Sequence, residues 1–174
     1  SDGNELWSKV PASTAYDVVA VDGTVYVGFG DGSVGAYDAD TGNEQWKKQF
    51  DSSGTMASID YRSGVLYIGT YEGKLKAYDL SEETVTWTHR LFSSSRGISG
   101  VVVGDDGMVF GYPSSGGEDV KAYDPSTGSE SWSFSDGSGY VESIDSSGDY
   151  VYYGDGSGNV YALTTSGGSQ EWSQ

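Results

Sequence analysis

The sequence predicts an all-β protein, a β-propeller of four four-stranded blades, on three observations. Five tryptophans recur at spacings of 39, 41, 45 and 40 residues: Trp7, Trp46, Trp87, Trp132 and Trp172. An alanine stands ten residues before each of the last four, at Ala36, Ala77, Ala122 and Ala162. A glycine closes a β-prone run in each unit, at Gly28, Gly69, Gly111 and Gly154. Four short strands in each unit of this length are typical of propeller blades.

The first unit shows the strand pattern most clearly. The run from Asp17 to Val21 leads through Asp22-Gly23 into TVYVGF. Asp-Gly between alternating apolar residues indicates a two-residue hairpin, because both turn positions need φ > 0. Asp31-Gly32 then leads into SVGAYD, and a turn at 40–42 leads to NEQWKKQF.

The later units repeat this order, with hairpin turns expected at Ser63-Gly64, Asp106-Gly107 and Ser147-Gly148. The predicted blades cover approximately 16–50, 56–92, 98–135 and 140–174, within a single domain of residues 1–174. Gly111 and Ala122 lie 11 residues apart, where the other units use 8, so we expect three extra residues in the 112–119 loop. This insertion marks either the functional face of the propeller or neutral sequence variation in a surface loop.

The last two strands of each unit are joined by the most regular motif in the chain. AYDADTGNEQW (36–46) and AYDPSTGSESW (122–132) share Ala-x-Asp-x-x-Thr-Gly-x-x-x-Trp, whereas AYDLSEETVTW (77–87) and ALTTSGGSQEW (162–172) keep parts of it. The Asp suits an Asx-type turn and the Gly a positive φ. The Trp is large enough to bridge neighbouring blades. We therefore expect all five tryptophans, Trp7 included, to be structural docking residues.

This pattern resembles the tryptophan-docking motif of the PQQ-like (quinoprotein alcohol dehydrogenase-like) β-propeller repeat family, over nearly the whole chain. Members of that family commonly have eight blades, so the resemblance implies either a four-bladed ring or half of an eight-bladed ring. It also implies that an N-terminal strand closes the ring. Residues 1–10 are a fifth copy of the closing strand, although 170–174 already supply one. The surplus strand closes the ring, pairs with another subunit, or belongs to a longer propeller.

Composition restricts the class of partner. With 26 acidic and 9 basic residues the net charge is −17, and such a polyanion repels nucleic acid and anionic lipid surfaces. Apolar stretches are too short for membrane insertion. The scattered carboxylates indicate a salt-rich environment, or else a surface that collects cations or binds a basic partner. Cysteine is absent, so disulfides and thiolate sites are excluded. The Ser-, Gly-, Thr- and Tyr-rich character suggests an extracellular or cell-surface protein.

Motifs for catalysis are weak. The resemblance implies that quinone-dependent members carry a vicinal cysteine pair, a calcium ion and a catalytic Asp, and this chain has no cysteine. His89 is the single histidine and is expected at the surface. The segment 30–35 matches G-x-G-x-x-G but lies between two strands, without the required helix. The segment starting at Asp38 lacks the spacing of a calcium loop. We predict no enzyme, no cofactor and no metal site.

A candidate ligand or partner face gathers residues from the loops that enter each blade and from the second hairpins: Arg96, Tyr112, Tyr71, Phe29 and Tyr140. An Arg among tyrosines suits a polar ligand or a protein partner. The predicted function is a non-catalytic scaffold for protein interaction or assembly, with a protein partner or self-association through the surplus strand. The alternatives are a self-assembling structural subunit and a propeller that binds a quinone cofactor or a small polar ligand.

Overall fold

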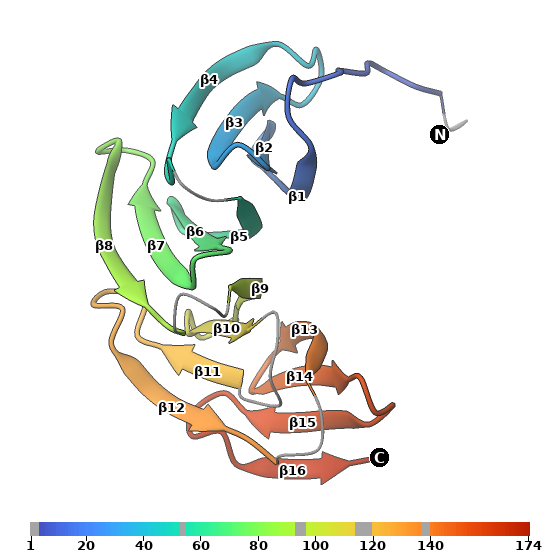
Figure 1. Ribbon diagram of the computed structural model, residues 1–174, viewed down its shortest axis with the longest axis vertical. Helices are drawn as coiled ribbons and strands as arrows, with labels where there is room; N and C mark the ends of the chain where they lie inside the picture. Colours follow the sequence, from blue (N-terminus) through green and yellow to red (C-terminus); the bar gives the residue numbers. More distant parts are fainter. Residues whose placement is uncertain (1–3, 53–54, 93–96, 114–119, 137–139) are drawn as a thin grey trace.

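The computed structural model describes residues 4–52, 55–92, 97–113, 120–136 and 140–174. These residues form sixteen strands in four antiparallel sheets, and in every sheet the strands are neighbours in chain order. The four sheets follow one another along an open arc, with blade 1 and blade 4 at its two ends (Figure 1). The all-β fold with four four-stranded blades is therefore confirmed.

The strands have these bounds. Blade 1 contains β1 (Ala15–Val21), β2 (Thr24–Phe29), β3 (Ser33–Asp38) and β4 (Glu44–Gln49). Blade 2 contains β5 (Met56–Arg62), β6 (Val65–Thr70), β7 (Lys74–Asp79) and β8 (Thr84–Arg90). Blade 3 contains β9 (Ile98–Val103), β10 (Val109–Pro113), β11 (Val120–Tyr123) and β12 (Glu130–Phe134). Blade 4 contains β13 (Val141–Ser147), β14 (Tyr150–Asp155), β15 (Val160–Thr164) and β16 (Gln170–Ser173).

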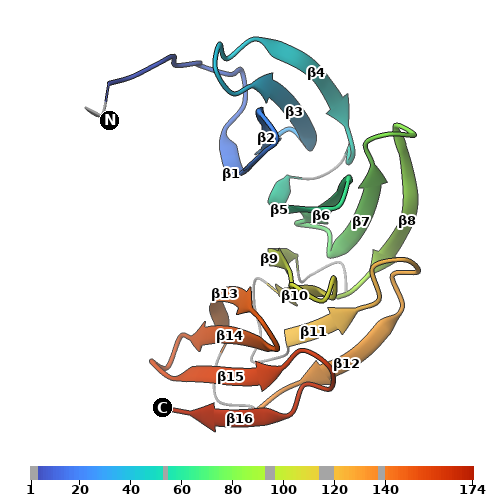
Figure 2. The ribbon, with the colours of Figure 1, turned by 180° about the vertical axis from the view of Figure 1, so that it is seen from behind.

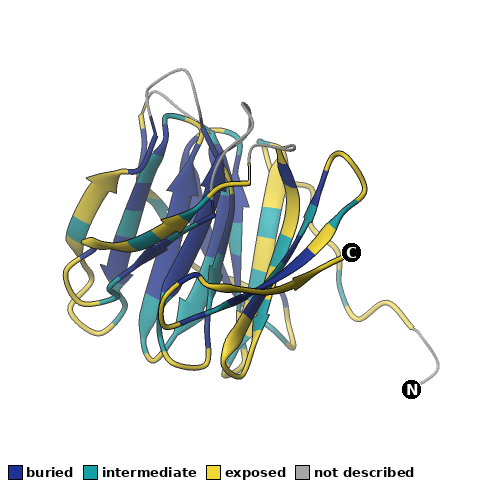
Figure 3. Cartoon of the chain, turned by 90° about the horizontal axis from the view of Figure 1, so that it is seen from below, coloured by how far each residue is buried: buried dark blue, intermediate teal, exposed yellow. Residues whose placement is uncertain are grey.

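The first strand of each blade lies on the concave side of the arc and the fourth strand on the convex side, as the view from behind also shows (Figure 2). Burial follows this order. The middle strands alternate apolar residues between two covered faces, whereas the outer strands β4, β8 and β12 are mostly exposed (Figure 3). The core consequently lies between blades, and each blade depends on its neighbours.

Each blade has two faces, and we name them by the neighbour they meet. The forward face turns toward the next blade in sequence and the rear face toward the preceding one. Between blades 1 and 2, for example, Tyr26 and Val34 on the forward face pack with Ile59 and Ile68 on the rear face of blade 2. Two further clusters fill the junctions between blades 2 and 3 and between blades 3 and 4.

The hairpin turns follow the prediction in the first half of the chain. Asp22 and Gly23 have φ values of 49° and 76°, and Ser63 and Gly64 have 49° and 86°, as a two-residue turn with left-handed backbone requires. In blade 3 the prediction of a two-residue turn is wrong, because Val103 pairs with Val109 across a longer loop. In blade 4 the turn is one residue later than predicted, since Ser147 itself pairs with Tyr150.

Blade 3 also corrects one repeat landmark. Tyr26 pairs with Ala36, Tyr67 with Ala77 and Tyr152 with Ala162, but in blade 3 the partner of Ala122 is Phe110. The position of the landmark glycine is therefore filled by Tyr112, and Gly111 belongs to the opposite face. The paired residues are twelve apart in blade 3 and ten apart elsewhere, so the hairpin carries two extra residues rather than three. Residues 114–119 lie outside the described residues.

Candidate assembly surface: docking turns and open blade faces

The turn between the third and fourth strands of a blade, here called the docking turn, is organised by an aspartate in blades 1 to 3 and by Thr164 in blade 4. In blade 3, Asp124 Oδ1 accepts hydrogen bonds from the backbone N–H groups of Ser126 and Thr127 and from both hydroxyls. These bonds, led by the Ser126 hydroxyl, hold the pKa of Asp124 below its ordinary value. Gly128 follows with φ 69°. The predicted Asx-type turn with a left-handed glycine is confirmed.

The docking turns of blades 3 and 4 each receive a tryptophan from the preceding blade. The Trp87 Nε1 of blade 2 donates to the carbonyl oxygen of Pro125 at 2.9 Å, and the Trp132 Nε1 of blade 3 donates to that of Thr165 at 2.7 Å. The indole lies flat on the glycine: a Cβ added to Gly128 would lie 2.6 Å from Trp87 Cε3. A side chain at this position would prevent the ring from docking.

The docking turn of blade 2 has no glycine at the left-handed position, and different contacts hold the turn in the same backbone geometry. Glu83 occupies the left-handed position with φ 53°. Lys48 from blade 1 reaches Glu83 Oε2 at 2.8 Å and Tyr78 Oη at 2.6 Å, and its ammonium lies 5.5 Å from the centroid of the Trp46 ring. Trp46 Nε1 has no hydrogen-bond partner among the described residues. Hydrogen bonds from Lys48 and its cation–π contact with Trp46 thus replace the indole hydrogen bond at this junction.

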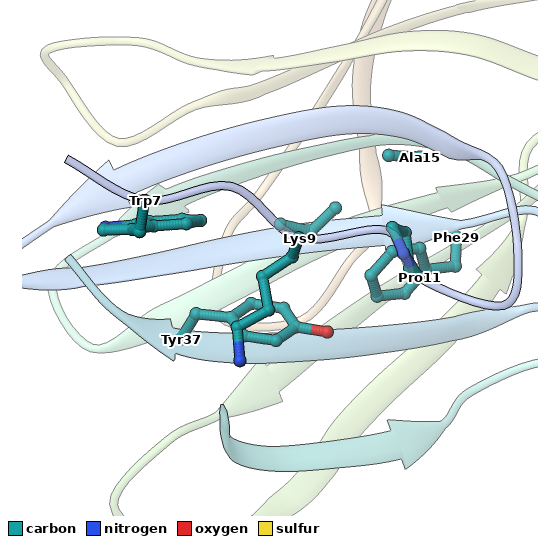
Figure 4. A pocket seen from close by; sticks show the side chains of 7 residues that line it. Trp7, Lys9, Pro11, Ala15, Phe29 and Tyr37 are labelled. Atoms are coloured by element: carbon teal, nitrogen blue, oxygen red, sulfur yellow. The ribbon is translucent and has the colours of Figure 1, made fainter. Parts of the chain in front are cut away.

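The N-terminal arm, residues 4–14, supplies the tryptophan for blade 1. No strand is assigned in this segment. Nevertheless, Trp7 Nε1 donates to the carbonyl oxygen of Ala39 at 2.9 Å, and its ring covers Gly42 as Trp87 covers Gly128. The arm crosses the rear face of blade 1 beside a cavity of about 150 Å³, where Lys9 and Pro11 lie near Phe29 and Tyr37 (Figure 4). The arm therefore occupies the place of an outer strand without being part of a sheet.

Carboxylates on the innermost strands link neighbouring blades. Asp17 Oδ1 accepts a hydrogen bond from the backbone N–H group of the next residue, Val18. Asp17 Oδ2 accepts hydrogen bonds from Ser58 Oγ and Ile59 N of blade 2. Asp60 repeats the arrangement: Oδ1 accepts from Tyr61 N and Oδ2 from Val103 N of blade 3. Burial raises the pKa of Asp60, although these hydrogen bonds oppose the shift. One oxygen thus serves the blade itself and the other serves the next blade.

The forward face of blade 4 presents the same groups without a neighbour. Val160 has the position of Val34, Leu75 and Val120 in the sheet pairing, yet its exposed fraction is 45%, against 0%, 0% and 1% for the other three. Trp172 is 48% exposed, and its Nε1 has no hydrogen-bond partner among the described residues. Its ring still contacts Tyr152, as Trp46 contacts Tyr26.

Asp145 and Gly154 on this face have the features of residues that contact the next blade at the other junctions. Asp145 Oδ1 accepts from Ser146 N, as in blades 1 and 2, but Oδ2 has no partner within the part of the chain that the structure describes. A Cβ on Gly28 would lie 3.2 Å from Met56 Cβ, and one on Gly69 would lie 2.7 Å from Ile98, because the next blade approaches there. At Gly154 the nearest atom is Ser143 Oγ at 3.5 Å, within the same blade. Blade 4 thus keeps the features of a blade junction, and no described residue covers this face.

The predicted ligand face is not brought together as one exposed surface. Phe29 and Tyr112 are buried, Phe29 under the Lys47 ammonium and Tyr112 with its hydroxyl donating to the Glu142 carbonyl oxygen. Tyr71 and Tyr140 are exposed, and Tyr71 makes an edge contact with Tyr16. Arg96 lies outside the described residues. A ligand role for these residues stays a prediction.

Other classes of site find little support in the described ranges. His89 is exposed and lies against Trp87, where both cover Gly128. No group of three or more His, Cys, Asp or Glu side chains in these ranges is arranged to hold a metal ion. Nor do the described residues contain a helix of the length and apolarity that a membrane crossing needs.

Sequence reasoning missed Val160, Gly154 and Asp145 as members of a surface. A signal was present, because Val160 and Gly154 occupy the repeat positions of Val34 and Gly28, and Asp145 occupies the position of Asp60. Aligning the blades by strand position would have revealed these equivalences. The shifted glycine of blade 3 obscured that alignment.

An array of blades joined by indole docking defines a propeller of PQQ-like repeats. The family model described as outer membrane protein assembly factor BamB matches residues 1–96 and 30–174, and the chain belongs to this family of PQQ-like repeats. No curated protein matches the sequence.

Solved structures agree on the fold. The computationally designed Ika4 protein is 18% identical, with a TM-score of 0.79 over 93% of this chain and 98% of its own. The designed Ika8 protein is 19% identical, with a TM-score of 0.79 over 92% of this chain and 48% of its own. BamB from Moraxella catarrhalis is 21% identical, with a TM-score of 0.74 over 97% of this chain and 51% of its own. The chain thus spans about half the length of Ika8 and of BamB.

Proposed function

We propose that the protein is a non-catalytic assembly module that joins another propeller surface through its open blade faces. The observation that carries the proposal is Val160, which is 45% exposed at a position whose three equivalents are buried. Val160 and Trp172 together form an apolar edge of a kind that soluble chains normally cover. The family description as an assembly factor supports the same role.

The proposal includes the ionic strength and the location in which the protein assembles. A net charge of −17 opposes the approach of two such chains at low ionic strength, and salt screens that repulsion. An extracellular or cell-surface location in a salt-rich setting suits a chain that assembles under those conditions.

Light scattering over a range of protein and salt concentrations tests the assembly role. We expect a mass above one chain that rises with salt. Val160→Asp should restore the mass of one chain, because it places a charge in the apolar edge. Val85→Asp is the matched control, since Val85 is an exposed valine on the outer strand β8, away from the open face. A single-chain mass under all conditions, or an equal effect of the two variants, would contradict the proposal.

The absence of catalysis needs its own test. Titration with pyrroloquinoline quinone and Ca²⁺, followed by visible absorbance, separates a scaffold from a quinoprotein. We expect no saturable change. Saturable binding would instead favour the cofactor-binding alternative.

A further inference from the structure

The docking site on blade 1 has two possible occupants, and this competition suggests how assembly is controlled. Trp7 from the N-terminal arm fills it within the chain. Trp172 has the same place in the motif, and its indole is exposed and without a hydrogen-bond partner in the described residues. Both rings cannot lie on Gly42 at once.

We propose that a second copy of this chain displaces the arm, so that its Trp172 docks on Gly42 and the Ala39 carbonyl oxygen and its blade 4 packs on blade 1. The N-terminal arm then acts as a built-in competitor that restrains assembly. This inference rests on the proposed assembly function and names its partner and its contact.

The rear face of blade 1 matches what the forward face of blade 4 requires. Ile59 and Val101, which receive the preceding blade, are 4% and 7% exposed, whereas the equivalent Val18 of blade 1 is 60% exposed. At the inner junction Gly28 faces Met56 and Ile59. By strand position Gly154 would face Ala15 and Val18 of the second copy.

The hydrogen-bonding groups match as well. Asp60 Oδ2 accepts from Val103 N, and the equivalents of these two residues at the new junction are Asp145 and Ala20. The backbone N–H groups of Ile59, Val101 and Val103 donate to side chains of the preceding blade. Ala20 N has the strand position of Val103 N, on the edge of blade 1 that would face blade 4 of the second copy. Ala20 N is therefore the donor that Asp145 Oδ2 lacks.

The arm is the occupant that yields. Trp172 belongs to β16, which is paired with β15 through Tyr161↔Ser173, Ala162↔Trp172 and Leu163↔Gln170. The arm has no such ladder. Removing the arm from blade 1 consequently breaks fewer backbone hydrogen bonds than removing β16 from blade 4. The surplus strand would then restrain assembly rather than close the ring.

A second copy is favoured over an unrelated partner because forward-to-rear junctions between blades already occur three times within this chain. A junction between blade 4 of one copy and blade 1 of the next is head-to-tail, so it ends only if it closes into a ring. The chain covers 48% of one superposed propeller and 51% of another, so two copies joined at two identical junctions match the length of such a ring. We expect a closed pair.

Engineered cysteines test the contact, since the chain has no cysteine of its own. Gly154→Cys mixed with Ala15→Cys under oxidising conditions should give a disulfide-linked pair of chains. Gly28→Cys with Met56→Cys in one chain is the internal reference, with Cβ atoms 3.2 Å apart before relaxation, near the range of disulfides. Ser129→Cys in place of Ala15→Cys is the negative control, because Ser129 lies on the exposed docking turn of blade 3.

The tryptophans test the competition. Trp7→Ala should tighten the association by about tenfold or more, because the binding-competent state no longer has to displace a docked ring. Trp172→Ala should weaken it by about thirtyfold or more, the usual loss for a central interface tryptophan. If both variants weaken the association equally, the arm supports assembly and the competition is refuted. Association without the Gly154–Ala15 cross-link would refute the contact and leave the assembly function standing, whereas a single-chain mass would refute both.

Discussion

Gly128→Ala tests the docking turn as the physical basis of the repeat. The residue has φ 69°, and a left-handed conformation costs a side-chain-bearing residue roughly 1–2 kcal/mol. In addition, the new Cβ would lie 2.6 Å from Trp87 Cε3 and 2.6 Å from His89 Cδ2. Forcing a methyl group into such a contact costs about 1–3 kcal/mol. We expect a total loss of roughly 2–5 kcal/mol.

Gly23→Ala provides the control that separates the two contributions. Gly23 has φ 76°, and an added Cβ would meet no atom within 4 Å. It carries the backbone cost alone, and the entropy lost from the unfolded chain is the same for both variants. Urea unfolding followed by tryptophan fluorescence should show Gly128→Ala to be less stable than Gly23→Ala by about 1–3 kcal/mol. Equal destabilisation would mean that the indole does not depend on the glycine, and the reasoning would fail.

Three further predictions concern stability and association. Trp132→Ala should lower the free energy of unfolding by about 3–5 kcal/mol. Trp172→Ala removes an exposed ring and should lower the free energy of unfolding of the single chain far less. Equal decreases in chemical unfolding would contradict the description of the forward face of blade 4 as uncovered. Asp124→Asn should reduce stability at neutral pH, because the lowered pKa of Asp124 stabilises the fold only while the carboxylate is ionised. The difference in stability from the wild type should therefore shrink as the pH falls below the ordinary aspartate pKa of 3.8. A difference that is constant with pH would refute this reasoning. Added salt should strengthen association, since it screens the repulsion between chains of net charge −17, and weaker association at high salt would indicate an ionic contact instead.

The repeat and its strands were predictable because their signals are local. Asp-Gly turns and the Ala-x-Asp-x-x-Thr-Gly pattern act within a few residues of the structure they specify, and the regular tryptophan spacing gives the length of the repeat. The same holds for the left-handed glycines at 42, 128 and 168, which follow from the turn chemistry of the motif.

The errors arose where pairing between strands decides the outcome. Gly111 resembles the other landmark glycines in sequence, but the pairing of Phe110 with Ala122 moves it to the opposite face and places Tyr112 at the junction. The open faces were hidden for a related reason. Val34 and Val160 are equivalent in sequence, and only the arrangement of the blades shows that one is covered and the other is exposed.

The N-terminal arm lies between these cases. Its tryptophan was predictable from spacing, whereas its role depends on a site 32 residues away, at Ala39. The sequence indicates one closing segment too many, and the structure shows the first of them docked at Ala39 and Gly42, the site of the proposed competition.

The most direct test of the central claim is the solution mass of Gly154→Leu compared with that of the wild type, measured by light scattering at high salt. Around Gly154 the single chain has room for a side chain, with the nearest atom at 3.5 Å, whereas the proposed junction brings a second copy onto this point. The account predicts the mass of two chains for the wild type and the mass of one folded chain for the variant. The same mass for both proteins would contradict it.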